Sequence, residues 1–198
     1  MKRLHRPDLY GWSFFNPERN LDFHSVLWVR AEGNVVFDPL PLTEHDAAHL
    51  ASLGKVAWIA ITNSDHVRDA AALAERTGAK LAGPAGERAG FPVPCDRWLG
   101  DGDVLVEGVE VIELSGSKTA GELAFVLRTD TLITGDLVRA HEGGQLARLP
   151  DAKLNDKSQA LASLARLAAR PIEAVLVGDG WPVFRDGQRA LRELAARG

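Results

Sequence analysis

The chain contains two stretches in which the same order of structural signals recurs, and this repeat strongly constrains its fold. In the first, residues 26–38 form two apolar runs around Gly33, a pattern typical of a β-hairpin, and the second run ends at Asp38. A helix over residues 43–54 and an apolar strand over residues 56–62 are expected to follow. Because that strand is apolar at consecutive positions, we expect it to be covered on both faces.

The second stretch repeats this order with little residue identity. Residues 123–136 predict a hairpin that ends at Asp136, and residues 156–170 predict a helix that begins with a capping box. The apolar strand that begins at Glu173 then delivers Asp179 between two glycines. The chain is therefore a degenerate internal duplication in the order of its elements.

The remaining segments complete a layered α/β protein. A helix is predicted to begin near Ser64 or Asp65 and to stop at Gly78, and another to begin near Gly187. Residues 98–114 alternate apolar and polar side chains, which predicts antiparallel strands. Two mixed β-sheets with outer helices, a four-layer αββα sandwich, would cover all of these faces, and we expect residues 1–198 to form a single domain.

The composition limits the kinds of partner that the protein is expected to bind. The 23 basic and 27 acidic residues give a net charge of −4, so nucleic acid is not expected as a partner. One cysteine, Cys95, excludes an internal disulfide, and no apolar run is long enough to cross a membrane. We expect a cytoplasmic protein with no membrane partner. Residues 9–23 are rich in aromatic side chains, which could pack in the core, form the lip of a pocket or make a homodimer contact.

Polar residues at the predicted strand ends form the candidate site. In a layered α/β fold, Asp65, His66, Asp136 and Asp179 are expected to meet in one crevice. Taken singly, each has a plain structural use, such as capping a helix or supporting a turn. Together they indicate a bound cation, because several carboxylates packed closely are costly unless positive charge neutralises them.

The order of five motifs, VVFDP, ITNSDH, GSKTAGE, ITGDL and LVGDGW, resembles the metallo-β-lactamase superfamily from about Val26 to Trp181. The resemblance implies a metallo-β-lactamase-like αββα sandwich. It also implies hydrolysis of an ester, amide, thioester or phosphoester by a metal-bound hydroxide. Under this alignment Ile61, Asn63 and Lys118 stand where the superfamily has histidine ligands of a first ion, with Ser117 as the alternative for the third. The positions assigned to the second ion keep ligating side chains, namely Asp65, His66, Asp136 and Asp179.

Two interpretations follow from this degenerate metal-binding motif. In the first, the chain is a hydrolase with at most one divalent ion, Zn²⁺, Mn²⁺, Fe²⁺ or Mg²⁺, and Asp65 or Asp179 accepts the proton. Lys118 then stabilises an oxyanion. Arg139 and His141, in the loop expected just after Asp136, are candidates for contacts with a small-molecule substrate.

In the second interpretation, no metal is bound. The ammonium of Lys118 takes the place of the lost ion and pairs with the carboxylates. The chain would then be a non-catalytic protein that binds a ligand or an interaction partner.

Overall fold

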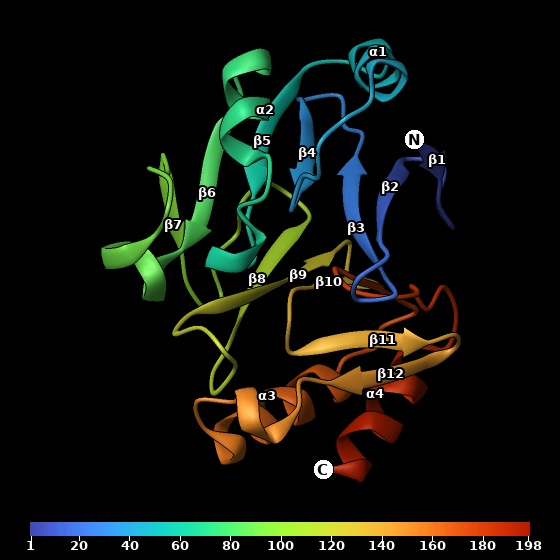
Figure 1. The fold of residues 1–198 in the computed structure, drawn as a ribbon, viewed down its shortest axis with the longest axis vertical. Coiled ribbons are helices and arrows are strands. Elements are labelled where there is room, and N and C mark those ends of the chain that lie inside the picture. The colour runs from blue at the N-terminus through green and yellow to red at the C-terminus, as the bar shows by residue number, and fades with distance from the viewer.

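Two β-sheets lie between two pairs of helices in the computed structural model, which describes residues 1–198 (Figure 1). The first sheet has the order β1 (Lys2–Arg3), β2 (Leu9–Asn16), β3 (Leu21–Trp28), β4 (Asn34–Phe37), β5 (Val56–Ala60), β6 (Lys80–Pro84) and β7 (Arg97–Leu99). The second has the order β13 (Ala174–Val177), β10 (Thr131–Thr134), β9 (Glu122–Leu127) and β8 (Val109–Leu114). The α-helices are α1 (Glu44–Ser52), α2 (Ala70–Thr77), α3 (Lys157–Ala168) and α4 (Gly187–Arg197).

Three apolar layers hold these elements together. Phe37 and Phe125 pack between the two sheets with ring centroids 5.2 Å apart. Leu73 of α2 belongs to the core between the first sheet and its helices, and Leu164 of α3 to the core outside the second sheet. Three apolar layers require four structural layers, and the predicted αββα sandwich is confirmed. None of the helices is long and apolar enough to cross a membrane.

The predicted repeat is present in the topology. Strand β3 pairs antiparallel with β4, and β4 runs parallel to β5 after the α1 crossover. In the same way β9 pairs antiparallel with β10, and β10 runs parallel to β13 after the α3 crossover. The caps agree with the sequence as well, since Thr43 caps α1 and the Asp156 side chain accepts a bond from Gln159 N–H at the start of α3.

Three local predictions were wrong. The helix predicted from residue 64 is a 3₁₀ turn, Ser64–His66, followed by a break at Arg68, which has a left-handed φ of +46°. Of the antiparallel strands predicted over residues 98–114, β8 is confirmed, because it pairs antiparallel with β9, whereas β7 belongs to the other sheet and pairs parallel with β6. Finally, Arg139 and His141 lie not in a loop but on β11 (Val138–Glu142), which pairs with β12 (Gln145–Arg148).

Candidate metal centre

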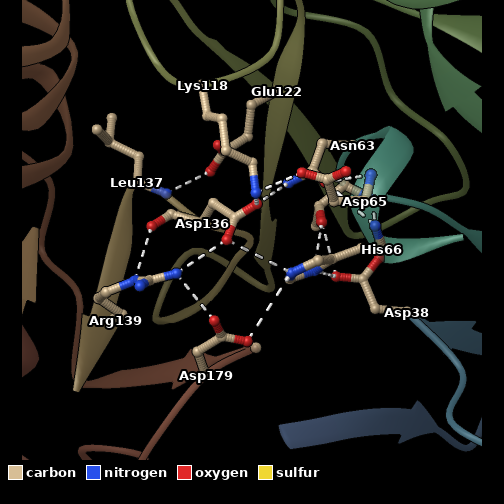
Figure 2. Close-up of polar contacts among 12 residues, drawn as sticks. Asp38, Asn63, Asp65, His66, Lys118, Glu122, Asp136, Leu137, Arg139 and Asp179 are labelled. Carbon is tan, nitrogen blue, oxygen red and sulfur yellow. Dashed lines mark hydrogen bonds and ion pairs between the residues drawn. The ribbon is translucent and has the colours of Figure 1, made fainter. Parts of the chain in front are cut away.

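The carboxyl ends of four strands carry the site residues to one place (Figure 2). Asp38 follows β4, Asp136 follows β10 and Asp179 follows β13, while the segment after β5 carries His66. Within each half the two strands concerned run parallel, so their polar ends emerge at the same edge of the sheet.

The imidazole of His66 is buried and is oriented by Asp38. Its Nδ1 lies 2.7 Å from Asp38 Oδ2 and 3.1 Å from the Thr62 hydroxyl. Asp38 also accepts hydrogen bonds from the backbone N–H and the hydroxyl of Thr62, at 2.8 and 2.7 Å. With Nδ1 engaged, Nε2 faces Asp136 and Asp179 and lies 3.9 Å from one oxygen of each.

Opposing influences act on the pKa of His66. Burial lowers it, and the guanidinium of Arg68 acts in the same direction. The carboxylates of Asp38 and Asp136 outweigh both effects, so the pKa of His66 lies above its ordinary value. Without a metal, the imidazole therefore contributes positive charge to the cluster over a wider pH range than a free histidine would.

Asp136 and Asp179 are almost fully buried and share one cation. Nη2 of Arg139 donates to Asp136 Oδ1 and to Asp179 Oδ2, both at 2.9 Å. Burial raises the pKa of Asp136, but the positive charges of His66, Lys118 and Arg139 hold it below its ordinary value. Asp136 is therefore ionised at neutral pH.

Lys118 lies on the exposed side of the cluster. Its Nζ contacts the carboxylate of Asp65 and is 3.2 Å from Asp136 Oδ2. Asp65 is half exposed and lies against Lys118, outside the group that His66, Asp136 and Asp179 form, in which the ligand atoms are within 4.8 Å of one another. The structure thus brings together three of the four predicted metal ligands and pairs the fourth with Lys118.

Ser117 does not face this group. Its hydroxyl donates to Oε2 of Glu122, and Oε1 of Glu122 accepts the backbone N–H of Leu137 at 2.8 Å. Burial, with the charge of Asp136 second, raises the pKa of Glu122 to about 7. Of the two alternatives that the sequence left open, it is therefore Lys118 whose side chain reaches the cluster.

The glycines on either side of Asp179 allow close packing. A Cβ at Gly178 would lie 2.6 Å from Cε1 of His66. Gly180 has a φ of +94°, and a Cβ there would lie 1.9 Å from the carbonyl oxygen of Ala140. Only glycine fits at these two positions, and their backbone approach sets Asp179 against His66.

Arg139 and His141, the predicted substrate contacts, have different surroundings. The Arg139 side chain is only 11% exposed because its guanidinium is engaged by the two carboxylates. His141 is exposed and makes no hydrogen bond to the cluster. Together with Arg148 and Arg197, His141 lines a hollow of about 380 Å³. None of the three clustered ligands, His66, Asp136 and Asp179, lines this hollow.

Sequence reasoning missed three residues of the site. Asp38 orients His66, Glu122 links the loop of Lys118 to the turn of Asp136, and Nη2 of Arg68 lies 3.5 Å from Oδ1 of Asp179. Only Asp38 had a signal in the sequence, since it ends its hairpin as Asp136 ends the other.

Comparison with known proteins decides the family. A family model described as the metallo-β-lactamase superfamily matches residues 1–197. The chain belongs to the metallo-β-lactamase superfamily.

Two curated proteins are similar to the chain in sequence, and both are named hydroxyacylglutathione hydrolase. The protein of Rhodobacter capsulatus is 34% identical over 114 residues, which cover 56% of this chain and 42% of that protein. The protein of Acidiphilium cryptum is 27% identical over 143 residues, covering 69% of this chain and 58% of that protein. The matches thus span about half the length of these curated relatives.

Solved structures of superfamily members share the fold at low identity. A metallo-β-lactamase from Pontibacter korlensis superposes with a TM-score of 0.75 and 16% identity, covering 98% of this chain and 97% of that chain. FIM-1 from Pseudomonas aeruginosa, described in its mono-zinc form, has a TM-score of 0.71 and 11% identity, covering 98% and 94%.

The donor set of this superfamily member fits a single divalent ion. Oδ1 of Asp179 is buried without a hydrogen-bond partner and faces Nε2 of His66. Ligand atoms about 2.1 Å from a common ion lie at most about 4.2 Å apart, and the 3.9 Å separations of His66 Nε2 from the oxygens of Asp136 and Asp179 are within that limit. The group as a whole is bounded by 4.8 Å, so its side chains would draw closer together to hold an ion. One imidazole and two carboxylates suit Zn²⁺, Mn²⁺ or Fe²⁺.

Ile61 and Asn63, which align with ligands of the superfamily's first ion, have structural roles here. The side chain of Ile61 is fully buried in the core beneath α2. Asn63 uses its Oδ1 to accept the backbone N–H groups of Asp65 and His66, and its amide donates to Asp136 at 3.3 Å. Asn63 is thus the cap of the turn that carries His66.

Proposed function

We propose that the chain is a metal-dependent hydrolase of a small-molecule substrate that binds at most one divalent ion, through His66, Asp136 and Asp179. The observation that carries the proposal is the buried Oδ1 of Asp179, which accepts no hydrogen bond and faces Nε2 of His66, with only the guanidinium of Arg68 beside it at 3.5 Å. Burying such an oxygen without a hydrogen bond is costly, and an ion in direct contact with it would offset more of that cost than a guanidinium at 3.5 Å does. The hydrolase names of the two curated relatives agree with this activity.

The surrounding residues have defined roles in this proposal. Asp38 keeps the His66 imidazole oriented, and the ammonium of Lys118 is placed to donate to a developing oxyanion on the exposed side. A bound ion would supply a water of lowered pKa and polarise the substrate. Asp65, which is half exposed, or Asp179 would serve as the general base for the attacking water.

A second candidate, a metal-free ligand-binding or interaction protein, is favoured by the ion pairs. Four carboxylates surround the centre, those of Asp38, Asp65, Asp136 and Asp179. They are opposed by three permanent cations and one imidazole, those of Arg68, Lys118, Arg139 and His66. The cluster is therefore close to neutral without an ion, as expected of a buried ion-pair network.

Elemental analysis separates the two candidates. Protein stripped with a chelator and supplemented with Zn²⁺, Mn²⁺ or Fe²⁺ is expected to retain about one equivalent of ion and to hydrolyse at least one member of an ester, thioester and phosphoester panel. Asp179→Asn should lose both properties, while Asp186→Asn, a change at an exposed aspartate, should keep them. Retention of less than about a tenth of an equivalent would remove the hydrolase proposal and leave the metal-free candidate.

A further inference from the structure

We infer that Arg139 is a built-in competitor of the metal ion, so that the Arg139 bridge between Asp136 and Asp179 and ion binding by these carboxylates are alternative states of one site. The place of the ion rests on the proposed function. The competition itself goes beyond that proposal, because it assigns Arg139 control of ion affinity instead of the substrate contact that the sequence suggested.

Arg139 donates to one oxygen that an ion needs and to the neighbouring oxygen of a second ligand. Its Nη2 is 2.9 Å from Asp136 Oδ1, the same oxygen that lies 3.9 Å from His66 Nε2. Nη2 also binds the second oxygen of Asp179 at 2.9 Å, which fixes the rotation of that carboxylate. An ion bound to Asp136 Oδ1 would therefore lie within a few ångströms of the guanidinium, and like charges at that distance in a nearly buried site repel strongly.

The other two cations are held in different ways. Arg68 donates to the backbone carbonyls of His24, Asp38 and Gly178, at 2.6, 3.2 and 3.3 Å, and reaches Asp179 Oδ1 only at 3.5 Å. These carbonyl bonds keep Arg68 in place whether or not an ion is bound. Lys118 is one-third exposed and is shared with Asp65.

Arg139 thus differs from both, because its guanidinium donates to two of the three ion ligands at once. A neutral side chain at this position would remove the one cation that Asp136 and Asp179 share. Lys118 would remain at 3.2 Å from Asp136 and Arg68 at 3.5 Å from Asp179, and a cation from solution could replace the charge that was lost. Removing the guanidinium should therefore strengthen ion binding.

The test is the dissociation constant for Zn²⁺, measured by calorimetry on the chelator-stripped full chain. Arg139→Met and Arg139→Gln should each bind Zn²⁺ about tenfold more tightly or better than the wild type. Arg166→Met should bind like the wild type, because Arg166 pairs with Asp101 on the surface. Equal or weaker binding by the Arg139 variants would overturn the competition.

The outcomes also separate this inference from the proposed function. Zn²⁺ binding by the variants but not by the wild type would establish the competition and refute the single-ion hydrolase. Binding by the wild type with no gain in the variants would do the reverse, and no binding by any of them would refute both. If the variants do not fold, the Nε–H resonance of Arg139 in ¹⁵N-labelled wild type decides: it should shift as Zn²⁺ is added, and an unchanged resonance at full loading overturns the inference.

Discussion

Replacing Glu122 by glutamine should remove a loss of stability that the wild-type protein suffers as the pH rises. Glu122 is fully buried, and its two oxygens accept the hydroxyl of Ser117 and the backbone N–H of Leu137. Glutamine keeps the size of the side chain and the oxygen that Leu137 needs, but it cannot ionise. The change therefore isolates the cost of a buried negative charge.

The magnitude follows from the pKa of Glu122, which burial, with the Asp136 charge second, raises from 4.5 to about 7 on folding. One pKa unit corresponds to about 1.4 kcal/mol, so the ionised native state is disfavoured by about 3 kcal/mol. Because the folded carboxyl holds its proton more tightly, its stabilising effect is fully present below about pH 4.5 and is lost as the pH rises through about 7. The free energy of unfolding of Glu122→Gln minus that of the wild type should therefore increase by about 3 kcal/mol across this range.

Urea denaturation from about pH 4.5 to about pH 8, with a chelator present, measures this difference. Taking the difference between two proteins cancels the titration of every group that the substitution leaves alone. Glu107→Gln is the matched control, because Glu107 is exposed, and its difference from the wild type should stay flat with pH. A change of less than about 1 kcal/mol for Glu122→Gln over the same range would refute the reasoning.

Two further substitutions test the cluster. Lys118→Met should lower the free energy of unfolding by about 1–2 kcal/mol. The loss is this small because Lys118 is one-third exposed and Asp136 keeps its ion pair with Arg139. Urea denaturation measures the loss, and an unchanged midpoint would show that the pair of Lys118 and Asp136 adds no stability. Gly178→Ala should displace the His66 ring and weaken Zn²⁺ binding at least about tenfold in calorimetry, since the new Cβ would lie 2.6 Å from that ring. Gly143→Ala, which meets nothing within 4 Å, is the control, and equal effects of the two would contradict the packing argument.

The fold was predictable because its signals are local and repeated. The apolar runs that became β5 and β13 and the capping residues Thr43 and Asp156 act within a few positions of the chain, and each agrees with the layered arrangement. The break at Arg68 was not predictable, because no glycine marks its left-handed backbone. Contacts with the carbonyls of distant strands hold it in that conformation.

The site was predictable only in part, for a related reason. His66, Asp136 and Asp179 stand at strand ends, and strand ends converge in any sheet of this class. The roles of Arg139 and Glu122 depend on contacts across 40 and 15 positions of the chain, and neighbouring residues do not determine such pairings. Arg139 therefore lies nearly buried on β11 and not in the predicted loop.

The cluster also shows why the presence of ligands does not by itself determine whether an ion is bound. The carboxylates need positive charge whatever its source, because both are almost completely buried. An ion and the guanidinium of Arg139 both supply this positive charge, so binding of either one reduces the stabilisation that the other can add. The affinity for metal is therefore a difference between two pairings of Asp136 and Asp179. Arg139→Met leaves every ligand in place. We nevertheless expect it to change the affinity for the metal ion more than most other substitutions near the site.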